Sequence, residues 1–170
     1  YLALADIPEM RFVVSNTTES CIVFSAEDFL RELLMHRGDC SFCTKLFHKD
    51  ILDGMTFPVG ALNEDFHLLI ELLPKIGSFA NLSPYGYFVL YRLGSNTRKK
   101  EGFSRVFADN IDNADWVMEY VKEKCPNLEE IAFRFGIFQR IDYMLHIPIK
   151  MMNKENAQYS KVVGYLRKNY

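Results

Sequence analysis

Helical periodicity in the C-terminal part of the chain constrains the fold more than any other feature. Three amphipathic helices are predicted after Asp109: one over residues 111–124, one beginning near Asn127, and one over residues 153–168. Apolar side chains three and four positions apart give each segment one apolar face, and such a face is stable only when it packs against another element. The C-terminal part is therefore expected to be helical and to pack on the rest of the chain.

The first part of the chain mixes strand and helix patterns. Runs rich in β-branched and aromatic residues predict strands at residues 11–14, 21–24, 79–82 and 85–93. Two helices are predicted between the second and third runs, one beginning at Ser25 and ending by Gly38, the other beginning near Glu64. We expect an α/β fold (α+β for this chain taken alone), with a mixed part over residues 1–105 and a helical extension over residues 106–170.

Composition and charge exclude several classes of protein. The 170 residues are 49% hydrophobic, which is enough to build a core. With 20 Lys and Arg against 22 Asp and Glu, the chain has no net positive field, so no nucleic-acid partner is expected. No apolar run approaches the roughly 18 residues of a membrane-spanning helix, and the features of a signal peptide are absent. We expect a cytoplasmic protein, with Tyr1 lying inside a longer chain.

The four cysteines include one pair whose spacing has chemical meaning, Cys40 and Cys43. A Cys-x-x-Cys pair is half of a zinc site or a redox pair, but a zinc site needs two further ligands at similar spacing, and the sequence offers none. Two reduced thiols are the favoured interpretation. No metal site is predicted within this chain.

Two adjacent acids, Glu64 and Asp65, follow a Phe-Pro-x-Gly turn at residues 57–60. The helix dipole favours acids at a helix N-terminus, so capping alone explains both residues. The functional alternative places Asp65 in a cleft as a general base within hydrogen-bond reach of an incoming hydroxyl. Spacing alone favours capping.

An arginine stands at the end of the aromatic-rich run, and a Gly-Ser turn follows it. The guanidinium of Arg92 and the backbone N–H groups of a turn through Gly94 and Ser95 can together bind a phosphate. Taken alone, a surface arginine before a turn is the simpler explanation.

Taken together and in order, these stretches resemble the second half of a family 2 glycosyltransferase, the bacterial enzymes that decorate exopolysaccharide and capsule. That family carries an Asn-Lys-Leu-aromatic segment, a Phe-Pro-x-Gly turn, a Glu-Asp pair and a Tyr-rich strand that leads into Arg-x-Gly-Ser. The corresponding residues here are Thr44-Lys45-Leu46-Phe47, Phe57-Pro58-Val59-Gly60, Glu64-Asp65 and Arg92-Leu93-Gly94-Ser95. The match covers roughly residues 20–105.

The resemblance implies part of a GT-A-type fold and inverting transfer of a sugar from a nucleotide-sugar donor to a hydroxyl of a glycan acceptor. It implies that Asp65 deprotonates the acceptor and that Glu64 either shapes the acceptor pocket or polarises Asp65. It also implies substrate contacts for Lys45, Arg92 and Ser95, the last two on the diphosphate side of the cleft.

The sequence departs from the family pattern in its donor site. The family's nucleotide-binding half has no counterpart here, and neither does the Asp-x-Asp pair that holds Mg²⁺ or Mn²⁺ on the donor diphosphate. A chain with the base but without a donor site cannot complete the reaction. This chain alone is therefore expected to be inactive, while its full-length parent is expected to be the enzyme and to bind the divalent metal.

Two alternatives belong to other classes of protein. The first is a non-catalytic module that binds a glycan or a protein, including a second copy of the chain in a homodimer. The second is peripheral membrane contact through the last helices, where basic residues accompany phenylalanines: Arg134, Arg140 and Lys150 beside Phe133, Phe135 and Phe138. Nearby acids dilute that basic face, so packing of these helices against the α/β part is favoured.

Overall fold

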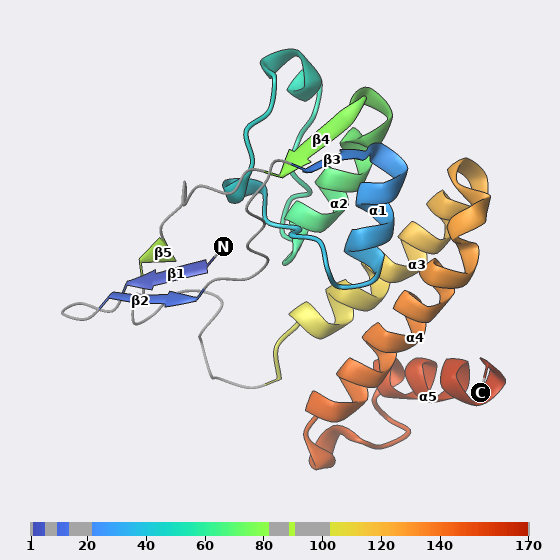
Figure 1. Cartoon of the computed structure of the whole chain (residues 1–170). Helices are drawn as coiled ribbons and strands as arrows, with labels where there is room; N and C mark the ends of the chain where they lie inside the picture. Colours follow the sequence, from blue (N-terminus) through green and yellow to red (C-terminus); the bar gives the residue numbers. More distant parts are fainter. Residues whose placement is uncertain (1, 6–9, 14–21, 82–88, 91–102, 170) are drawn as a thin grey trace.

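The computed structural model describes residues 2–5, 10–13, 22–81, 89–90 and 103–169. Most of these residues are helical, and the strands are short, so the expected mixture of helix and strand is confirmed with helix predominating (Figure 1). The helices are α1 (Ala26–Leu34), α2 (Glu64–Leu72), α3 (Val106–Lys124), α4 (Glu129–His146) and α5 (Ala157–Asn169). The strands are β1 (Leu2–Ala5), β2 (Met10–Val13), β3 (Ile22–Ser25), β4 (Ser78–Asn81) and β5 (Val89–Leu90).

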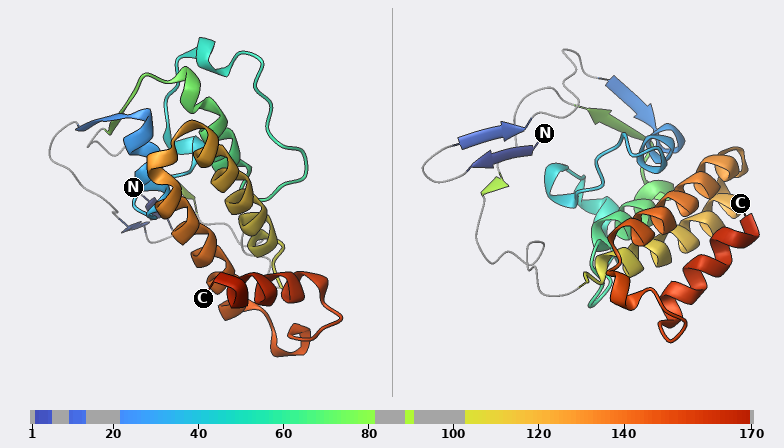
Figure 2. Two further views of the ribbon diagram at one scale, coloured as in Figure 1. Left: turned by 90° about the vertical axis from the view of Figure 1, so that its right-hand side faces the viewer. Right: turned by 90° about the horizontal axis from the view of Figure 1, so that it is seen from below.

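The described strands form two small sheets. β3 and β4 pair antiparallel, with Ile22 opposite Asn81 and Ser25 opposite Ser78. In the other sheet, β1 lies between β2, to which it is antiparallel, and β5, to which it is parallel. Figures 1 and 2 show this second sheet apart from the helices, whereas β3 and β4 lie against α1. The strands expected at 21–24 and 79–82 are thus confirmed to within a residue, and most of the run at 85–93 lies outside the described residues.

The first helix begins as its sequence predicts, but it ends at Leu34, before the expected stop at Gly38. The Ser25 hydroxyl accepts a hydrogen bond from the Asp28 backbone N–H at 3.0 Å and donates one to the Asp28 carboxylate at 2.7 Å. At the other end His36 turns the chain with a φ of 56°. The N–H of Gly38 then donates to the carbonyl of Glu32 at 2.9 Å, which satisfies a carbonyl of the last turn.

The boundaries of the later helices differ from the prediction at their N-termini. α3 begins at Val106, earlier than the expected residue 111. α4 begins at Glu129 after a 3₁₀ turn, and Asn127, expected to cap it, instead donates to the Glu27 carboxylate on α1. A tertiary contact has therefore replaced a local cap.

Asparagine hydrogen bonds explain the late start of α5. The Asn153 side-chain oxygen accepts from the backbone N–H groups of Glu155 and Asn156, at 3.0 and 3.2 Å, which forms a turn rather than a helix. The Asn156 side chain then accepts from the N–H of Tyr159 at 3.1 Å, and α5 begins at Ala157. Asn153 and Asn156 could each cap the helix, and Asn156 is the residue that does so.

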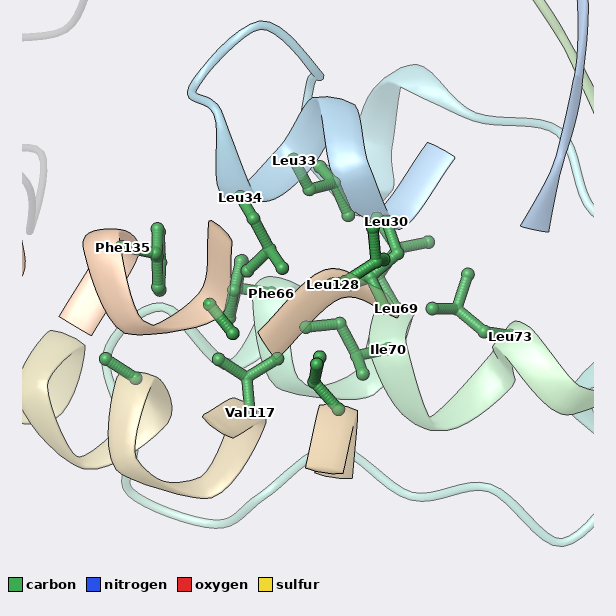
Figure 3. Packing of buried hydrophobic residues seen from close by; sticks show 13 residues of the cluster. Leu30, Leu33, Leu34, Phe66, Leu69, Ile70, Leu73, Val117, Leu128 and Phe135 are labelled. Carbon is green, nitrogen blue, oxygen red and sulfur yellow. The ribbon is translucent and has the colours of Figure 1, made fainter. Parts of the chain in front are cut away.

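One hydrophobic cluster joins α1, α2, α3 and α4 (Figure 3). Its members come from both sides of the boundary expected between residues 105 and 106. The largest are Leu30, Leu33, Leu34, Phe66, Leu69, Ile70, Leu73, Val117, Val121, Leu128 and Phe135, all buried. The helical extension therefore shares its core with α1 and α2, as the apolar faces of its helices require.

A second cluster and one buried arginine hold α5 in place. Ile111, Tyr143, Ile147 and Val162 are buried together. Arg140 on α4 is 2% exposed, bonds to the Asp115 carboxylate on α3, and lies 3.6 Å from the ring centroid of Tyr165 on α5. Because Arg140 is enclosed in this way, it is not available to the basic membrane-facing surface considered from the sequence.

Candidate functional site

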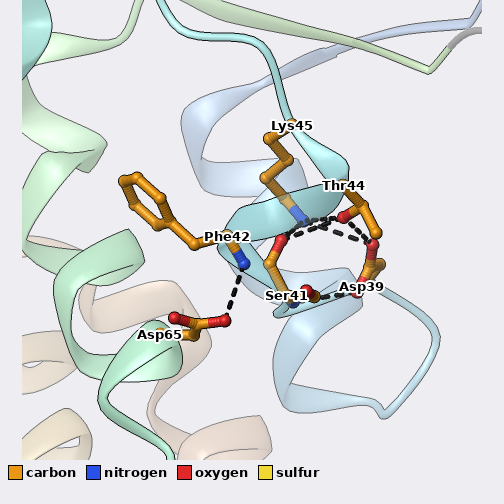
Figure 4. A network of polar contacts seen from close by, with 6 residues as sticks. All are labelled: Asp39, Ser41, Phe42, Thr44, Lys45 and Asp65. Carbon is orange, nitrogen blue, oxygen red and sulfur yellow. Dashed lines mark hydrogen bonds and ion pairs between the residues drawn. The ribbon is translucent and has the colours of Figure 1, made fainter. Parts of the chain in front are cut away.

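The two acids expected at a helix N-terminus occupy the first turn of α2, and both are half-buried. Asn63 precedes them in the left-handed conformation, with a φ of 70°, and its side chain does not cap the helix. The Asp65 carboxylate does not bond within its own helix in this contact; it accepts a hydrogen bond from the backbone N–H of Phe42 at 2.9 Å (Figure 4). Asp65 therefore caps a neighbouring segment, the 3₁₀ turn Phe42–Thr44, through one oxygen of its carboxylate.

Phe42 is the point at which three of the sequence motifs meet. Its ring stacks on Phe47 at a centroid distance of 4.4 Å and lies in a T-shaped arrangement with Phe57 at a centroid distance of 5.2 Å. Phe47 belongs to the Lys-Leu-Phe segment, Phe57 opens the Phe-Pro-x-Gly turn, and Asp65 comes from the Glu-Asp pair. Segments that are separate in sequence are thus gathered around one aromatic side chain.

Lys45 is held in the loop that precedes this aromatic cluster. Its ammonium donates to the carbonyl of Ser41 at 2.7 Å and lies 3.4 Å from the Asp39 carboxylate. Asp39 also accepts from the Ser41 backbone N–H at 2.9 Å and from the Thr44 hydroxyl. Figure 4 shows Lys45 and Asp65 on either side of the 3₁₀ turn that carries Phe42.

The electrostatics of this loop reflect partial burial. Burial lowers the pKa of Lys45, and the carboxylates of Asp39 and Asp65 act in the opposite direction. Burial alone would raise the pKa of Asp39, but hydrogen bonds from Thr44 and Ser41 and the charge of Lys45 together lower it below its ordinary value. Burial, with the nearby Asp39 charge, raises the pKa of the Cys40 thiol.

The start of α3 fixes the N-terminus of α2. The Leu62 backbone N–H donates to the Asp109 carboxylate at 2.8 Å, and the side-chain amides of Asn63 and Asn110 bond at 2.8 Å. Asn113 donates to the carbonyl of Asn63 at 3.2 Å. These contacts cannot be predicted from sequence alone, because the partners are 47 to 50 positions apart and nothing local to either segment marks them.

The structure brings together some of the expected site residues. Asp65 and Lys45 lie around the 3₁₀ turn, and Glu64 precedes Asp65 in the first turn of α2. Arg92 and Ser95 lie outside the described residues. Cys40 and Cys43 are free thiols. Among the residues that the structure describes, no group of three or more His, Cys, Asp or Glu side chains is arranged to hold a metal ion.

None of the helices that the structure describes is both long enough and apolar enough to cross a lipid bilayer. Comparison of the chain with known protein families, with curated proteins and with solved structures finds no match. The function of the chain is therefore inferred from its residues and their geometry.

Proposed function

We propose that this chain is the acceptor-side part of an inverting, GT-A-type glycosyltransferase of bacterial surface-polysaccharide synthesis. Its substrates in the full-length protein would be a nucleotide sugar and a hydroxyl of a glycan. The observation that carries the proposal is the convergence on Phe42: the Lys-Leu-Phe segment, the Phe-Pro-x-Gly turn and Asp65 all contact that residue. The shared contact brings the three motifs together in the folded chain.

Asp65 is the proposed general base. Its carboxylate lies in the first turn of α2, at the end of the helix where the backbone N–H groups carry positive partial charge. The Phe42 N–H holds Oδ2, and this bond fixes the direction of the carboxylate. In the proposed step Asp65 takes the proton of the acceptor hydroxyl while the oxygen of that hydroxyl forms a bond to the anomeric carbon of the donor sugar. The bond from that carbon to the nucleoside diphosphate breaks on the opposite face.

The other residues have supporting roles in the proposal. Glu64, beside the base, shapes the acceptor pocket, and Lys45 contributes a positive charge on the far side of the 3₁₀ turn. Arg92 and Ser95 are proposed to contact the donor diphosphate. The described residues do not fit a divalent-metal site, so no step is assigned here to the Mg²⁺ or Mn²⁺ expected in the parent enzyme.

The proposal is tested with the full-length gene product and a panel of uridine, guanosine and thymidine diphosphate sugars. Release of nucleoside diphosphate that depends on an added glycan acceptor is expected with one of these donors. Calorimetry on the 170-residue chain alone, with the same donors and Mn²⁺, is expected to show no binding. Absence of release with every donor would contradict the assigned activity, and saturable binding to the chain alone would contradict the expectation that the donor site lies elsewhere.

A further inference from the structure

The outward side of α4 carries an apolar surface. Phe138, Ile141 and Leu145 are three and four positions apart, so they lie on one side of the helix, and all three are exposed. The opposite side of α4 is buried through Ala132 and Tyr143. A helix that is apolar on both sides is normally covered on both. We call Phe138, Ile141 and Leu145 the outer face of α4.

The outer face is short and has one edge against α1. Leu145 is 76% exposed. The ring of Phe138 lies against the imidazole of His36, in the turn after α1, at a centroid distance of 4.2 Å, and its remaining surface is open. The face therefore extends over about two turns of the helix, from Phe138 to Leu145.

The two ends of α4 carry opposite charge. The helix begins with two exposed acids, Glu129 and Glu130, and the turn after its end carries two exposed lysines, Lys150 and Lys154. One acid, Glu155, lies in the same turn, so the turn stays net positive. Figure 1 shows this turn at the lower edge of the molecule, beyond the end of α4. Among the residues that the structure describes, neither lysine has an ion-pair partner.

These features fit two α4 helices that lie antiparallel, one from each of two copies of the chain. About a twofold axis near Ile141, Phe138 of one protomer lies opposite Leu145 of its partner, and the same contact repeats on the other side of the axis. The acidic first turn of each helix then lies beside the basic turn that follows the other. A parallel pair would bring like charges together, and opposed helix dipoles also favour the antiparallel arrangement.

The charges beside the outer face argue against a membrane as the occupant. Arg134 pairs with Glu130 at 2.5 Å, and His146 lies 3.2 Å from the Asp142 carboxylate. A helix that docks on an anionic bilayer has basic flanks, whereas these flanks carry both signs and pair within the helix. The unpaired charges lie at the two ends of the helix, where they can select its orientation against a second copy.

We propose that two copies of this chain associate through the outer face of α4, with the two helices antiparallel. A standard interface buries about 800 Å² on each partner, and a face of three side chains covers less, so a dissociation constant on the order of 10–100 µM is expected. The inference is independent of the role assigned to Asp65, because it uses other residues and concerns association rather than transfer.

Sedimentation equilibrium tests the association, with the 170-residue chain and with the full-length gene product, from about 1 µM to about 1 mM. We expect a monomer–dimer equilibrium. Leu145→Glu is expected to weaken it about tenfold or more, because a carboxylate would be buried against the partner's apolar face. Leu46→Glu makes the same change at a leucine outside α4 that is 98% exposed, so it is the matched control and should leave association unchanged.

Charge reversal tests the orientation. A copy with Glu129→Lys and Glu130→Lys is basic at both ends of α4, and a copy with Lys150→Glu and Lys154→Glu is acidic at both ends. Each copy alone is expected to dimerise severalfold more weakly than the parent chain at low ionic strength, and an equimolar mixture should regain the lost affinity. Rescue by mixing also shows that both variants are folded.

The proposal has clear contrary outcomes. It would be overturned by a chain or a full-length product that stays monomeric at every concentration, by Leu145→Glu dimerising like the parent chain, or by a mixture no tighter than its components. Binding of a monomeric chain to phosphatidylglycerol vesicles, lost in Leu145→Glu, would overturn it by assigning the outer face to a membrane.

Discussion

At the scale of single residues, Asp39 organises the loop beside the candidate base. It accepts hydrogen bonds from Ser41 and Thr44 and lies 3.4 Å from the Lys45 ammonium. The Lys45 side chain is 13% exposed, so its buried charge needs a nearby carboxylate to stabilise it. The Asp39 side chain is 50% exposed, so water screens its interaction with Lys45. Asp39 was not among the candidates from the sequence, since an acid after a glycine has no distinguishing pattern.

We expect Asp39→Asn to lower the free energy of unfolding by about 1 kcal/mol at neutral pH. Burial opposes the shift, but hydrogen bonds and the charge of Lys45 hold the pKa of Asp39 below its ordinary value of 3.8. The ionised Asp39 therefore contributes fully to the free energy of unfolding above pH 3.8, and this contribution is lost as the pH falls through the lowered pKa. Urea unfolding of both proteins at neutral pH and at successively more acid pH measures this. A stability difference that stays constant into strong acid would contradict the account.

Asp50→Asn is the matched control for that measurement. The Asp50 carboxylate lies 3.4 Å from the Nδ1 atom of His48, and the two side chains are 65% and 71% exposed. Exposed pairs of this kind contribute little, so the variant is expected to unfold like the parent chain at neutral pH.

At the scale of elements, local signals predicted where helices begin better than they predicted what the helices contact. Ser25 and the acids at the start of α2 mark two helix starts correctly. Asn153 marks a third start wrongly, because Asn156 supplies the cap instead. The Phe42–Asp65 bond spans 23 positions and exists only after α2 and the 3₁₀ turn have packed, so sequence could name Asp65 but not its partner.

Two glycines on different helices give opposite predictions. A Cβ at Gly164 on α5 meets nothing within 4 Å, so Gly164→Ala should raise the free energy of unfolding by about 0.5–1 kcal/mol through helix propensity. A Cβ at Gly136 on α4 would lie 2.8 Å from the sulfur of Met118 on α3, so Gly136→Val should lower it by about 1–3 kcal/mol. Urea unfolding measures both. Full tolerance of Gly136→Val would show that the Met118 side chain moves aside and does not restrict this position.

At the scale of the whole molecule, Arg140 connects α3, α4 and α5. Its replacement by methionine keeps the length of the side chain but leaves the Asp115 carboxylate, which is 36% exposed, without its main partner. We expect Arg140→Met to lower the free energy of unfolding by about 2 kcal/mol and to loosen α5, seen as faster amide exchange over Ala157–Asn169.

Arg134→Met is the control for this effect. Arg134 pairs with Glu130 on the surface of α4, and both side chains are about three-quarters exposed, at 74% and 76%. A change within about 0.5 kcal/mol is expected. If the two arginine variants were equally stable, Arg140 would not be the connection between the three helices.

The central claim is that Asp65 acts as the base of the full-length enzyme, and Asp65→Asn tests it most directly. Asparagine keeps a side-chain oxygen that can accept the Phe42 N–H, so the local fold is preserved while basicity is lost. At saturating donor, turnover should fall by about 10²–10⁴-fold while donor binding is unchanged, and Glu64→Gln should reduce turnover much less. Near-normal turnover of Asp65→Asn would show that Asp65 only caps the 3₁₀ turn and that the assigned mechanism is wrong.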